Sequence, residues 1–187
     1  MTEISFTQTV PEDDDRSRHV CDNCGFVLYE NPKIVVGSVV RHEGQILLCR
    51  RAINPRKGFW TIPAGYLELN EAPEDGARRE ASEEANITLD IERLLAVYSV
   101  PRISQVQLIY RARLARPDYS PGPESLEVKL FSPDDIPYDE LAFPSVHWAL
   151  GHDAEAEGGA PPVPFKNPEG ETGNMMPGGE RLRTENM

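Results

Sequence analysis

The order of apolar and charged segments limits the fold more than any other feature of this 187-residue sequence. Two short aliphatic runs, at 34–40 and 45–50, are separated by a glycine turn that is typical of a hairpin. One charged segment, 73–86, comes next, and it is followed by strand-like runs at 93–100, 105–114 and 126–131 and by a proline-started helix at 144–150. Because strands and helices do not alternate, the sequence predicts an α+β fold rather than parallel βαβ units.

Composition divides the chain into four segments. Residues 1–20 are polar and acidic, 21–33 form a small cysteine knuckle, and 34–150 have the pattern of a globular domain. Residues 151–187 are rich in glycine, proline and glutamate without any period, so we expect a disordered tail there.

The charge balance and the cysteine content narrow the class of protein. A net charge of −12 and a pI near 4.8 create no overall field that would attract nucleic acid or an anionic membrane. No apolar run approaches the roughly 18 residues that a membrane-spanning helix needs, and the first residues lack the pattern of a secretory signal. Three cysteines are too few for a disulfide scaffold, so we expect a cytoplasmic protein.

The charged segment contains three glutamates at helical spacing. In a helix Glu80 faces both Glu83 and Glu84, and each like-charge pair costs about 0.2–0.5 kcal/mol. Three carboxylates on one rigid face would form an oxygen-rich site that suits Mg²⁺ together with substrate phosphate oxygens. The alternative is a solvated charged face on which Arg78 and Arg79 are the partners.

Residues before this helix favour the metal site. Gly65 is followed after five residues by Glu71, and after seven more residues comes Arg79-Glu80-Ala81-Ser82-Glu83-Glu84. This spacing resembles the Nudix box, G-x5-E-x7-R-E-U-x-E-E-x-G-U, where U is an apolar residue. Asn86 replaces the last glycine of the pattern, a mild change because asparagine also tolerates the left-handed conformation, and Ala81 is a small residue for the first apolar position.

The resemblance extends over residues 32–150 and implies several properties. The fold would be a mixed sheet between helices, and the activity would be hydrolysis of a nucleoside diphosphate linked to another group. The implied metal ligands for Mg²⁺ or Mn²⁺ are Gly65, Glu80, Glu83 and Glu84. Glu71 and Arg79 would pair to hold the loop against the helix, and Glu83 or Glu84 would take the proton of the attacking water.

A further carboxylate and two arginines complete the expected site. Members of this family commonly carry another acidic residue well after the box, and here Glu127 is the preferred candidate and Glu124 the second. Strand alternation also allows an exposed, non-functional Glu127. Arg50 and Arg51 end a strand where the resemblance places phosphate, although one of them could serve surface solubility alone.

The substrate is less closely defined. The S-Q-P-W-P-F-P stretch of the NADH pyrophosphatases is absent, and similarity to "YENPKIVVG" and "PRISQVQLIY" favours ADP-ribose or FAD over NADH. Side chains that could stack on a base, or could equally be core residues, are Phe59, Tyr66, Tyr98, Phe143 and Trp148. The resemblance also implies a homodimer.

The knuckle resembles half of a zinc ribbon that precedes some members of this family. A closed zinc site needs four ligands, whereas Cys21 and Cys24 supply two and His19 at most a third. Zinc binding, a metal-free knuckle and a site completed across a dimer are therefore all open, with the metal-free knuckle favoured. Cys49, within an apolar strand, is expected to be a buried hydrophobic residue.

A function of another class must be weighed beside hydrolysis. The chain could be a catalytically inactive Nudix-like regulator that binds a nucleotide or nucleic acid. Such a nucleic-acid binder should show a basic patch with interleaved aromatic residues, but the N-terminal segment is acidic. The complete set of box glutamates favours catalysis.

Overall fold

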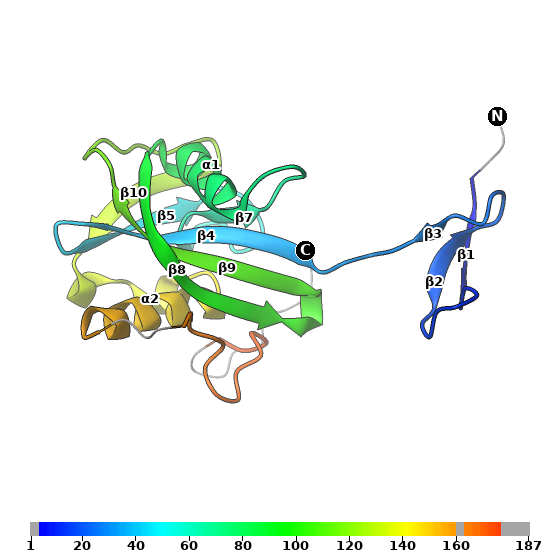
Figure 1. Ribbon diagram of the computed structural model, residues 1–187. Coiled ribbons are helices and arrows are strands. Elements are labelled where there is room, and N and C mark those ends of the chain that lie inside the picture. The colour runs from blue at the N-terminus through cyan, green and yellow to red at the C-terminus, as the bar shows by residue number, and fades with distance from the viewer. Residues whose placement is uncertain (1–3, 160–162, 177–187) are drawn as a thin grey trace. The chain divides into compact units, whose positions relative to one another are not determined.

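The computed structural model describes residues 4–159 and 163–176, and the chain divides into two compact units, Met1–Pro32 and Lys33–Met187 (Figure 1). The first unit is a three-stranded antiparallel sheet in the order β1-β2-β3, with bounds Phe6–Thr9, Arg18–Cys21 and Val27–Leu28. Among residues 4–32 only Cys21 is buried. The structure differs here from the expected division at residue 20, because the polar N-terminal segment supplies two of the three strands.

The second unit contains a seven-stranded mixed sheet. Its main path runs β10-β5-β4-β9-β8, while β6 pairs with β5 and β7 with β4. The strand bounds are β4 Lys33–His42, β5 Gln45–Arg51, β6 Trp60–Thr61, β7 Ala64–Tyr66, β8 Leu89–Val100, β9 Gln105–Leu114 and β10 Ser125–Phe131. Only the β4–β9 pair is parallel among the described strands, with Lys33 opposite Gln105. The predicted α+β class with a mixed sheet is confirmed.

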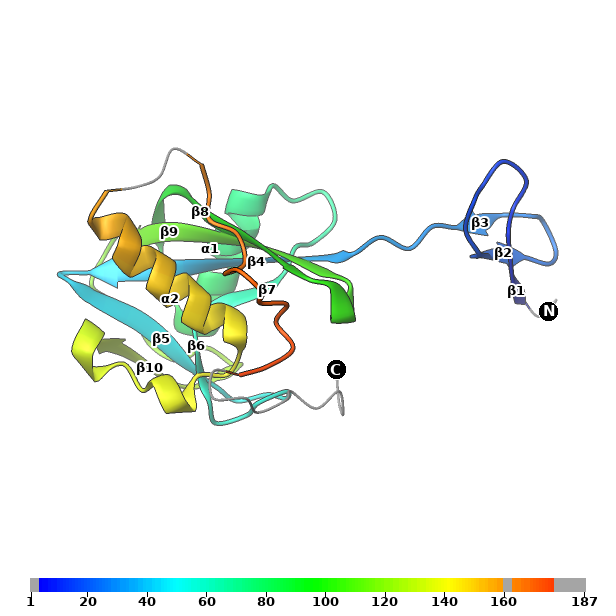
Figure 2. The same ribbon diagram turned by 90° about the horizontal axis from the view of Figure 1, so that it is seen from below.

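Two α-helices cover opposite faces of this sheet (Figure 1, Figure 2). Helix α1 spans Pro73–Ala85 and α2 spans Pro144–Glu157, and 3₁₀ turns lie at Pro101–Ile103, Pro133–Asp135 and Tyr138–Glu140. Each α-helix begins with proline at its first position and has no side-chain cap, so packing on the sheet must hold it. Neither helix in the described part of the chain is long and apolar enough to cross a membrane.

The two helices meet the sheet through different side chains. Ala77, Ala81 and Ala85 of α1 are fully buried, and this narrow stripe lets the helix axis lie close to the strands. Helix α2 instead inserts large apolar groups, including Trp148 and Leu150, into a core shared with β5 and β8. On the same helix, two carboxylates, Glu80 and Glu84, are buried as well.

The C-terminal part differs from the expected disordered tail that begins at residue 151. Helix α2 continues to Glu157, and residues 163–176 pack along β8. Phe165 stacks on His152 with ring centroids 4.3 Å apart, and Asn167 accepts the Ser99 N–H at 2.8 Å and donates to the Ser99 carbonyl at 2.8 Å. Residues 160–162 and 177–187 lie outside the described residues.

Candidate active site

Gly65 lies in β7, against the second turn of helix α1. Strand β7 pairs with β4, where Gly65 is opposite Val36. A Cβ atom at Gly65 would overlap the carboxylate of Glu80. The missing side chain at Gly65 therefore leaves room for the Glu80 carboxylate, which lies where the box loop meets the box helix.

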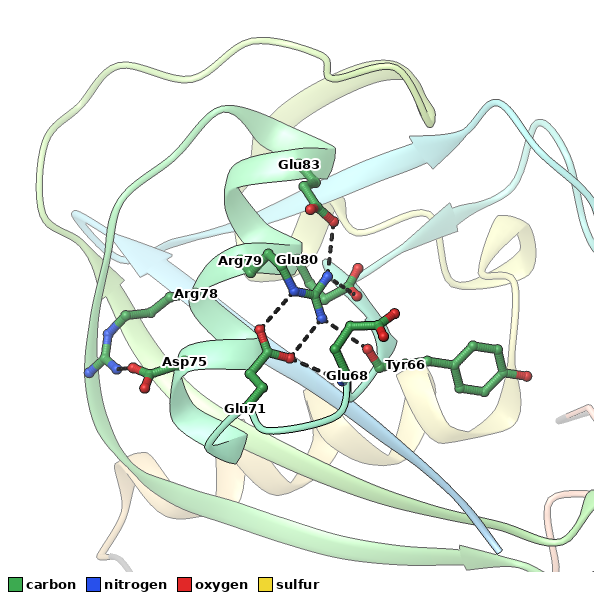
Figure 3. A network of polar contacts seen from close by, with 8 residues as sticks. All are labelled: Tyr66, Glu68, Glu71, Asp75, Arg78, Arg79, Glu80 and Glu83. Carbon is green, nitrogen blue, oxygen red and sulfur yellow. Dashed lines mark hydrogen bonds and ion pairs between the residues drawn. The ribbon is translucent and has the colours of Figure 1, made fainter. Parts of the chain in front are cut away.

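The guanidinium of Arg79 holds the box loop against α1 (Figure 3). Its Nε and Nη2 atoms donate to the two oxygens of Glu71 at 2.8 and 3.0 Å, and Nη2 also donates to the Tyr66 carbonyl at 2.9 Å. Glu71 accepts the Glu68 N–H at 3.1 Å as well. The charge-assisted bonds from Arg79 lower the pKa of Glu71, so this pair acts as a fixed clamp between loop and helix.

The same guanidinium also contacts two of the box glutamates (Figure 3). Its Nη1 atom donates to Glu80 at 2.7 Å and to Glu83 at 3.0 Å. Glu80 is buried, and burial raises its pKa even though Arg79 opposes the shift. Glu83 remains exposed, with 56% of its side chain accessible. Arg79 therefore supplies the compensating charge that the crowded glutamates need.

Glu84 is in a different position from the other box glutamates. Its residue is 5% exposed, and its carboxylate accepts one hydrogen bond, from the Ala64 N–H at 3.1 Å. Burial raises the pKa of Glu84 to about 8, and the charge of Glu80 adds to the rise. Within the described residues no ion pair reaches Glu84, so its negative charge is poorly compensated by the chain.

The structure separates the two candidates for an additional carboxylate. Glu124 immediately precedes β10, its carbonyl accepts the Ala52 N–H at 2.8 Å, and its charge raises the pKa of both Glu80 and Glu84. Glu127 lies within β10, and its carboxylate is 3.9 Å from Arg50 with both side chains roughly half exposed. Glu124 is thus electrostatically coupled to the box, although the sequence had favoured Glu127. No sequence signal separated the two candidates, because the turn at residues 122–125 and the start of β10 belong to the tertiary structure.

Arg51 and Arg50 also differ. Arg51 Nε donates to the Pro55 carbonyl at 2.8 Å, its guanidinium lies 5.2 Å from the Phe143 ring, and its charge acts on Glu84. Arg50 Nε donates to the Gly58 carbonyl at 2.8 Å, and its guanidinium lies 5.9 Å from the Trp60 ring. Of the two predicted phosphate-binding arginines, Arg51 is the one whose field reaches the box.

The aromatic candidates fall into two groups. Tyr98 is fully buried, and its hydroxyl forms a 2.7 Å hydrogen bond with His152 Nδ1. Its ring meets the Trp148 ring edge-on with centroids 5.3 Å apart, so both side chains belong to the core. Tyr66 is 50% exposed, and Phe59 is partly buried under the guanidinium of Arg56 at 3.8 Å. Tyr66, Phe59 and the Phe143 ring beside Arg51 remain available to a substrate.

The box side chains fit a divalent cation by their chemistry. In the described residues no three acidic, histidine or cysteine side chains converge on one point, because Arg79 draws Glu80 and Glu83 toward itself while Glu84 bonds to the backbone. All the candidate ligand atoms are nevertheless hard oxygens, and the charge of Glu80 makes a negative charge on the nearby buried Glu84 less favourable. A bound divalent cation would reduce this repulsion between the two carboxylates.

The knuckle of the N-terminal unit does not fit a closed zinc site. Cys21 is buried and Cys24 exposed, and both are free thiols. N–H groups of Asn23 and Cys24 donate to the Cys21 sulfur and lower its pKa. His19 lies 3.4 Å from Glu30, and the described residues contain no cluster of three metal-binding side chains. Two thiols are half of the tetrahedral set that a structural zinc requires.

Comparisons with known proteins agree with this geometry. A family model described as NUDIX domain matches residues 31–149, and one described as Nudix N-terminal, a zinc-ribbon family, matches residues 5–30. The crystal structure of a NUDIX hydrolase from Nitrosomonas europaea is 43% identical, with a TM-score of 0.81, and the match covers 86% of this chain and 92% of that chain.

Two curated relatives match over shorter regions. A MutT-like protein from Streptomyces ambofaciens is 37% identical over 102 residues, which cover 54% of this chain and 64% of the relative. An ADP-ribose pyrophosphatase from Methanocaldococcus jannaschii is 29% identical over 120 residues, which cover 62% of this chain and 70% of the relative. The match thus spans less than two thirds of the Streptomyces protein.

Proposed function

The chain belongs to the NUDIX family, and from that premise we propose that it is a metal-dependent pyrophosphatase acting on nucleoside diphosphates linked to another group. The preferred substrate is ADP-ribose, with FAD second and NADH less favoured. A relative that is named an ADP-ribose pyrophosphatase supports this choice. The sequence similarity of residues 29–37 and 101–110 to that branch supports it as well.

One observation carries the proposal. Glu84 is buried, has a raised pKa and lacks an ion pair in the described structure, while the carboxylate of Glu80 occupies the space that a side chain at position 65 would fill. A buried carboxylate without a counterion is costly, and such groups concentrate at functional sites. We assign cation binding to Glu80, Glu83, Glu84 and the Gly65 carbonyl, with Mg²⁺ preferred and Mn²⁺ as the alternative.

The chemistry divides between the cation and the protein side chains. When bound, a divalent cation neutralises diphosphate oxygens and makes a coordinated water more acidic. Arg51 would bind a phosphate oxygen near Glu84, and Tyr66, Phe59 or Phe143 would stack on the substrate's rings. Water attacks phosphorus, the bridging P–O bond breaks, and ADP-ribose would yield AMP and ribose 5-phosphate.

The proton of the attacking water needs an acceptor. We assign this role to Glu124, because its charge reaches Glu80 and Glu84 although it does not belong to the box helix. Glu83 and Glu84 are the other candidates for the same step. The Gln variants of the three residues would separate these roles, since a lost base leaves cation affinity largely intact whereas a lost ligand weakens it.

The decisive experiment is a substrate screen with ADP-ribose, FAD, NADH, diadenosine polyphosphates and nucleoside triphosphates, each with Mg²⁺ or Mn²⁺. We expect hydrolysis of ADP-ribose that requires the cation and is about 10³-fold less efficient in Glu84→Gln. Glu127→Gln serves as the control, because Glu127 pairs with Arg50 instead. The proposal fails if no substrate is cleaved and Glu84→Gln has no effect on substrate turnover. Nucleotide binding without hydrolysis would instead point to an inactive regulator.

Assembly and location form part of the proposal. We propose a cytoplasmic homodimer, which light scattering during size-exclusion chromatography would test. The two thiols of the knuckle make metal analysis of the same sample useful, because the described chain supplies only half of a zinc site.

A further inference from the structure

The end of helix α1 is tied to the loop between β9 and β10. Helix α1 ends at Ala85, and Asn86 follows in the left-handed conformation with φ 53° and ψ 37°. Its side-chain nitrogen lies 3.1 Å from each of three acceptors, the carbonyl and hydroxyl of Ser120 and the carbonyl of Pro121. The side chain of Asn86 is therefore used to hold a segment 34 residues further along the chain.

The loop returns hydrogen bonds to the same helix end. The Ser120 N–H donates to the Ala85 carbonyl at 3.0 Å, and the Gly122 N–H donates to the Glu84 carbonyl at 3.0 Å. Carbonyls in the last turn of a helix have no partner within the helix, so the loop satisfies two of them. Donors on both sides make this a two-way attachment between α1 and residues 120–122.

The loop and the helix are so close at position 122 that only glycine fits there. A Cβ atom on Gly122 would overlap the carbonyl oxygen of Glu83. The loop backbone thus lies directly on the turn of α1 that carries Glu83 and Glu84. Small movements of the loop would change its distance to those residues.

Glu124 follows two residues after this contact and is anchored on its other side. The Ser125 N–H donates to the Gly122 carbonyl at 3.0 Å, and the Ala52 N–H donates to the Glu124 carbonyl at 2.8 Å. Between these anchors Glu124 lies two residues after Gly122, whose N–H is bound to the Glu84 carbonyl. The position of Glu124 is therefore set on one side by the attachment of residues 120–122 to α1 and on the other by the bond to Ala52.

We propose that Asn86 is a positioning residue for the reaction, which fixes Glu124 relative to the box glutamates by holding the β9–β10 loop on the end of α1. The inference rests on the proposed function and deepens it. Glycine, which the Nudix box pattern has at this position, provides the left-handed helix end but no side chain that could bind the loop. Asparagine serves both purposes in this chain.

The test compares Asn86→Gly with the wild-type chain. Glycine keeps the left-handed helix end, so we expect folding to persist while kcat for ADP-ribose falls about 10- to 100-fold and KM stays within about twofold. Asn86→Asp is the second variant, because it keeps the size and the conformation but loses the donor. Asn70→Gly is the matched control, because Asn70 also has a positive φ, 62°, and its side chain makes no hydrogen bond among those found in the described residues. The Asn70→Gly change should leave kcat unchanged.

A double-mutant cycle with Glu124→Gln tests whether Asn86 acts through Glu124. Glu124→Gln alone should lower kcat about 10²- to 10³-fold, and adding Asn86→Gly should lower it no further. Amide hydrogen exchange supplies a measurement that does not depend on activity. The Ser120 and Gly122 amides should exchange faster in Asn86→Gly than in the wild type, whereas they should be unchanged in Asn70→Gly.

The outcomes distinguish the two proposals. A wild-type chain that hydrolyses no substrate overturns the proposed function, while the exchange rates still decide whether Asn86 holds the loop. Hydrolysis that is equally fast in Asn86→Gly, or losses that multiply in the double variant, overturn the positioning role. Unchanged exchange at Ser120 and Gly122 overturns it as well.

Discussion

Two carboxylates are buried on opposite faces of the sheet, and the chain treats them differently. Asp153 of α2 is fully buried and lies 2.9 Å from Arg41 and 3.5 Å from Arg111. Glu84 of α1 is 5% exposed and bonds to the Ala64 N–H. Burial raises the pKa of both side chains, but only Asp153 has arginines in contact with its oxygens.

This difference separates a structural carboxylate from a candidate functional one. The burial cost of Asp153 is offset by Arg41 and Arg111. Both arginines also contact Glu157 of α2, and Arg111 contacts Glu92, so these ion pairs connect α2 to strands β4, β9 and β8. The cost of burying Glu84 is not offset by a contacting cation of the described chain. A ligand from outside is therefore expected at Glu84 and not at Asp153.

Glu84→Gln should have the largest effect of the changes considered. Replacing the carboxyl group by an amide should lower kcat/KM for ADP-ribose by about 10³-fold, because a ligand of the cation is lost. The free energy of unfolding should stay equal or rise, because the burial that raises the pKa of Glu84 to about 8 disfavours the folded state at neutral pH, a cost that glutamine, which does not ionise, avoids. Steady-state kinetics and urea unfolding of the same samples would check both, and a strongly destabilised variant would contradict the comparison.

Asp153→Ala should show the opposite pattern. It leaves Arg41 and Arg111 without their buried partner, so the free energy of unfolding should fall by about 3–5 kcal/mol. Activity per folded molecule should remain near the wild-type value. Urea unfolding followed by fluorescence measures the first quantity, and an active-site defect as large as that of Glu84→Gln would show that the two carboxylates are not distinct.

Adding Mg²⁺ to metal-free protein sharpens the same comparison without measuring activity. At ten times its Kd a cation that binds only the folded state adds about 1.4 kcal/mol of stability, which for a chain of this size raises Tm by about 3–6 °C. Asp153→Asn should keep this response, and Glu84→Gln should lose most of it. Scanning calorimetry in EDTA and in Mg²⁺ measures the shifts, and equal responses in both variants would locate the cation elsewhere.

The Glu71–Arg79 clamp should show a smaller effect that depends on pH. Arg79 lowers the pKa of Glu71, so the stabilising contribution is complete above the ordinary value of 4.5 and is lost as pH falls through the lowered value. Glu71→Gln should therefore have a lower Tm than the wild type near pH 7, and the difference should shrink toward pH 3. A difference that grows on acidification would reverse this sign.

Short-range spacing was sufficient to predict the box. Glu80 and Glu84 lie on the buried side of α1 and Glu83 on its exposed side because helical geometry repeats every 3.6 residues, and the helix end at Asn86 follows from its local preference for the left-handed conformation. The Glu71–Arg79 contact was implied by resemblance to the Nudix box and is present in the structure. Each of these contacts lies within one loop and one helix.

The contacts that distinguish the candidate site from its surroundings required the tertiary structure. The sequence preferred Glu127 to Glu124, but the turn at residues 122–125 and the start of β10 bring Glu124 to the box. It likewise gave no sign that residues 163–176 would pack on β8. The sequence alone determined the carboxylate-rich helix, because its spacing is local. Only tertiary packing decided which carboxylates acquire counterions, because strand register and loop closure bring distant charges together.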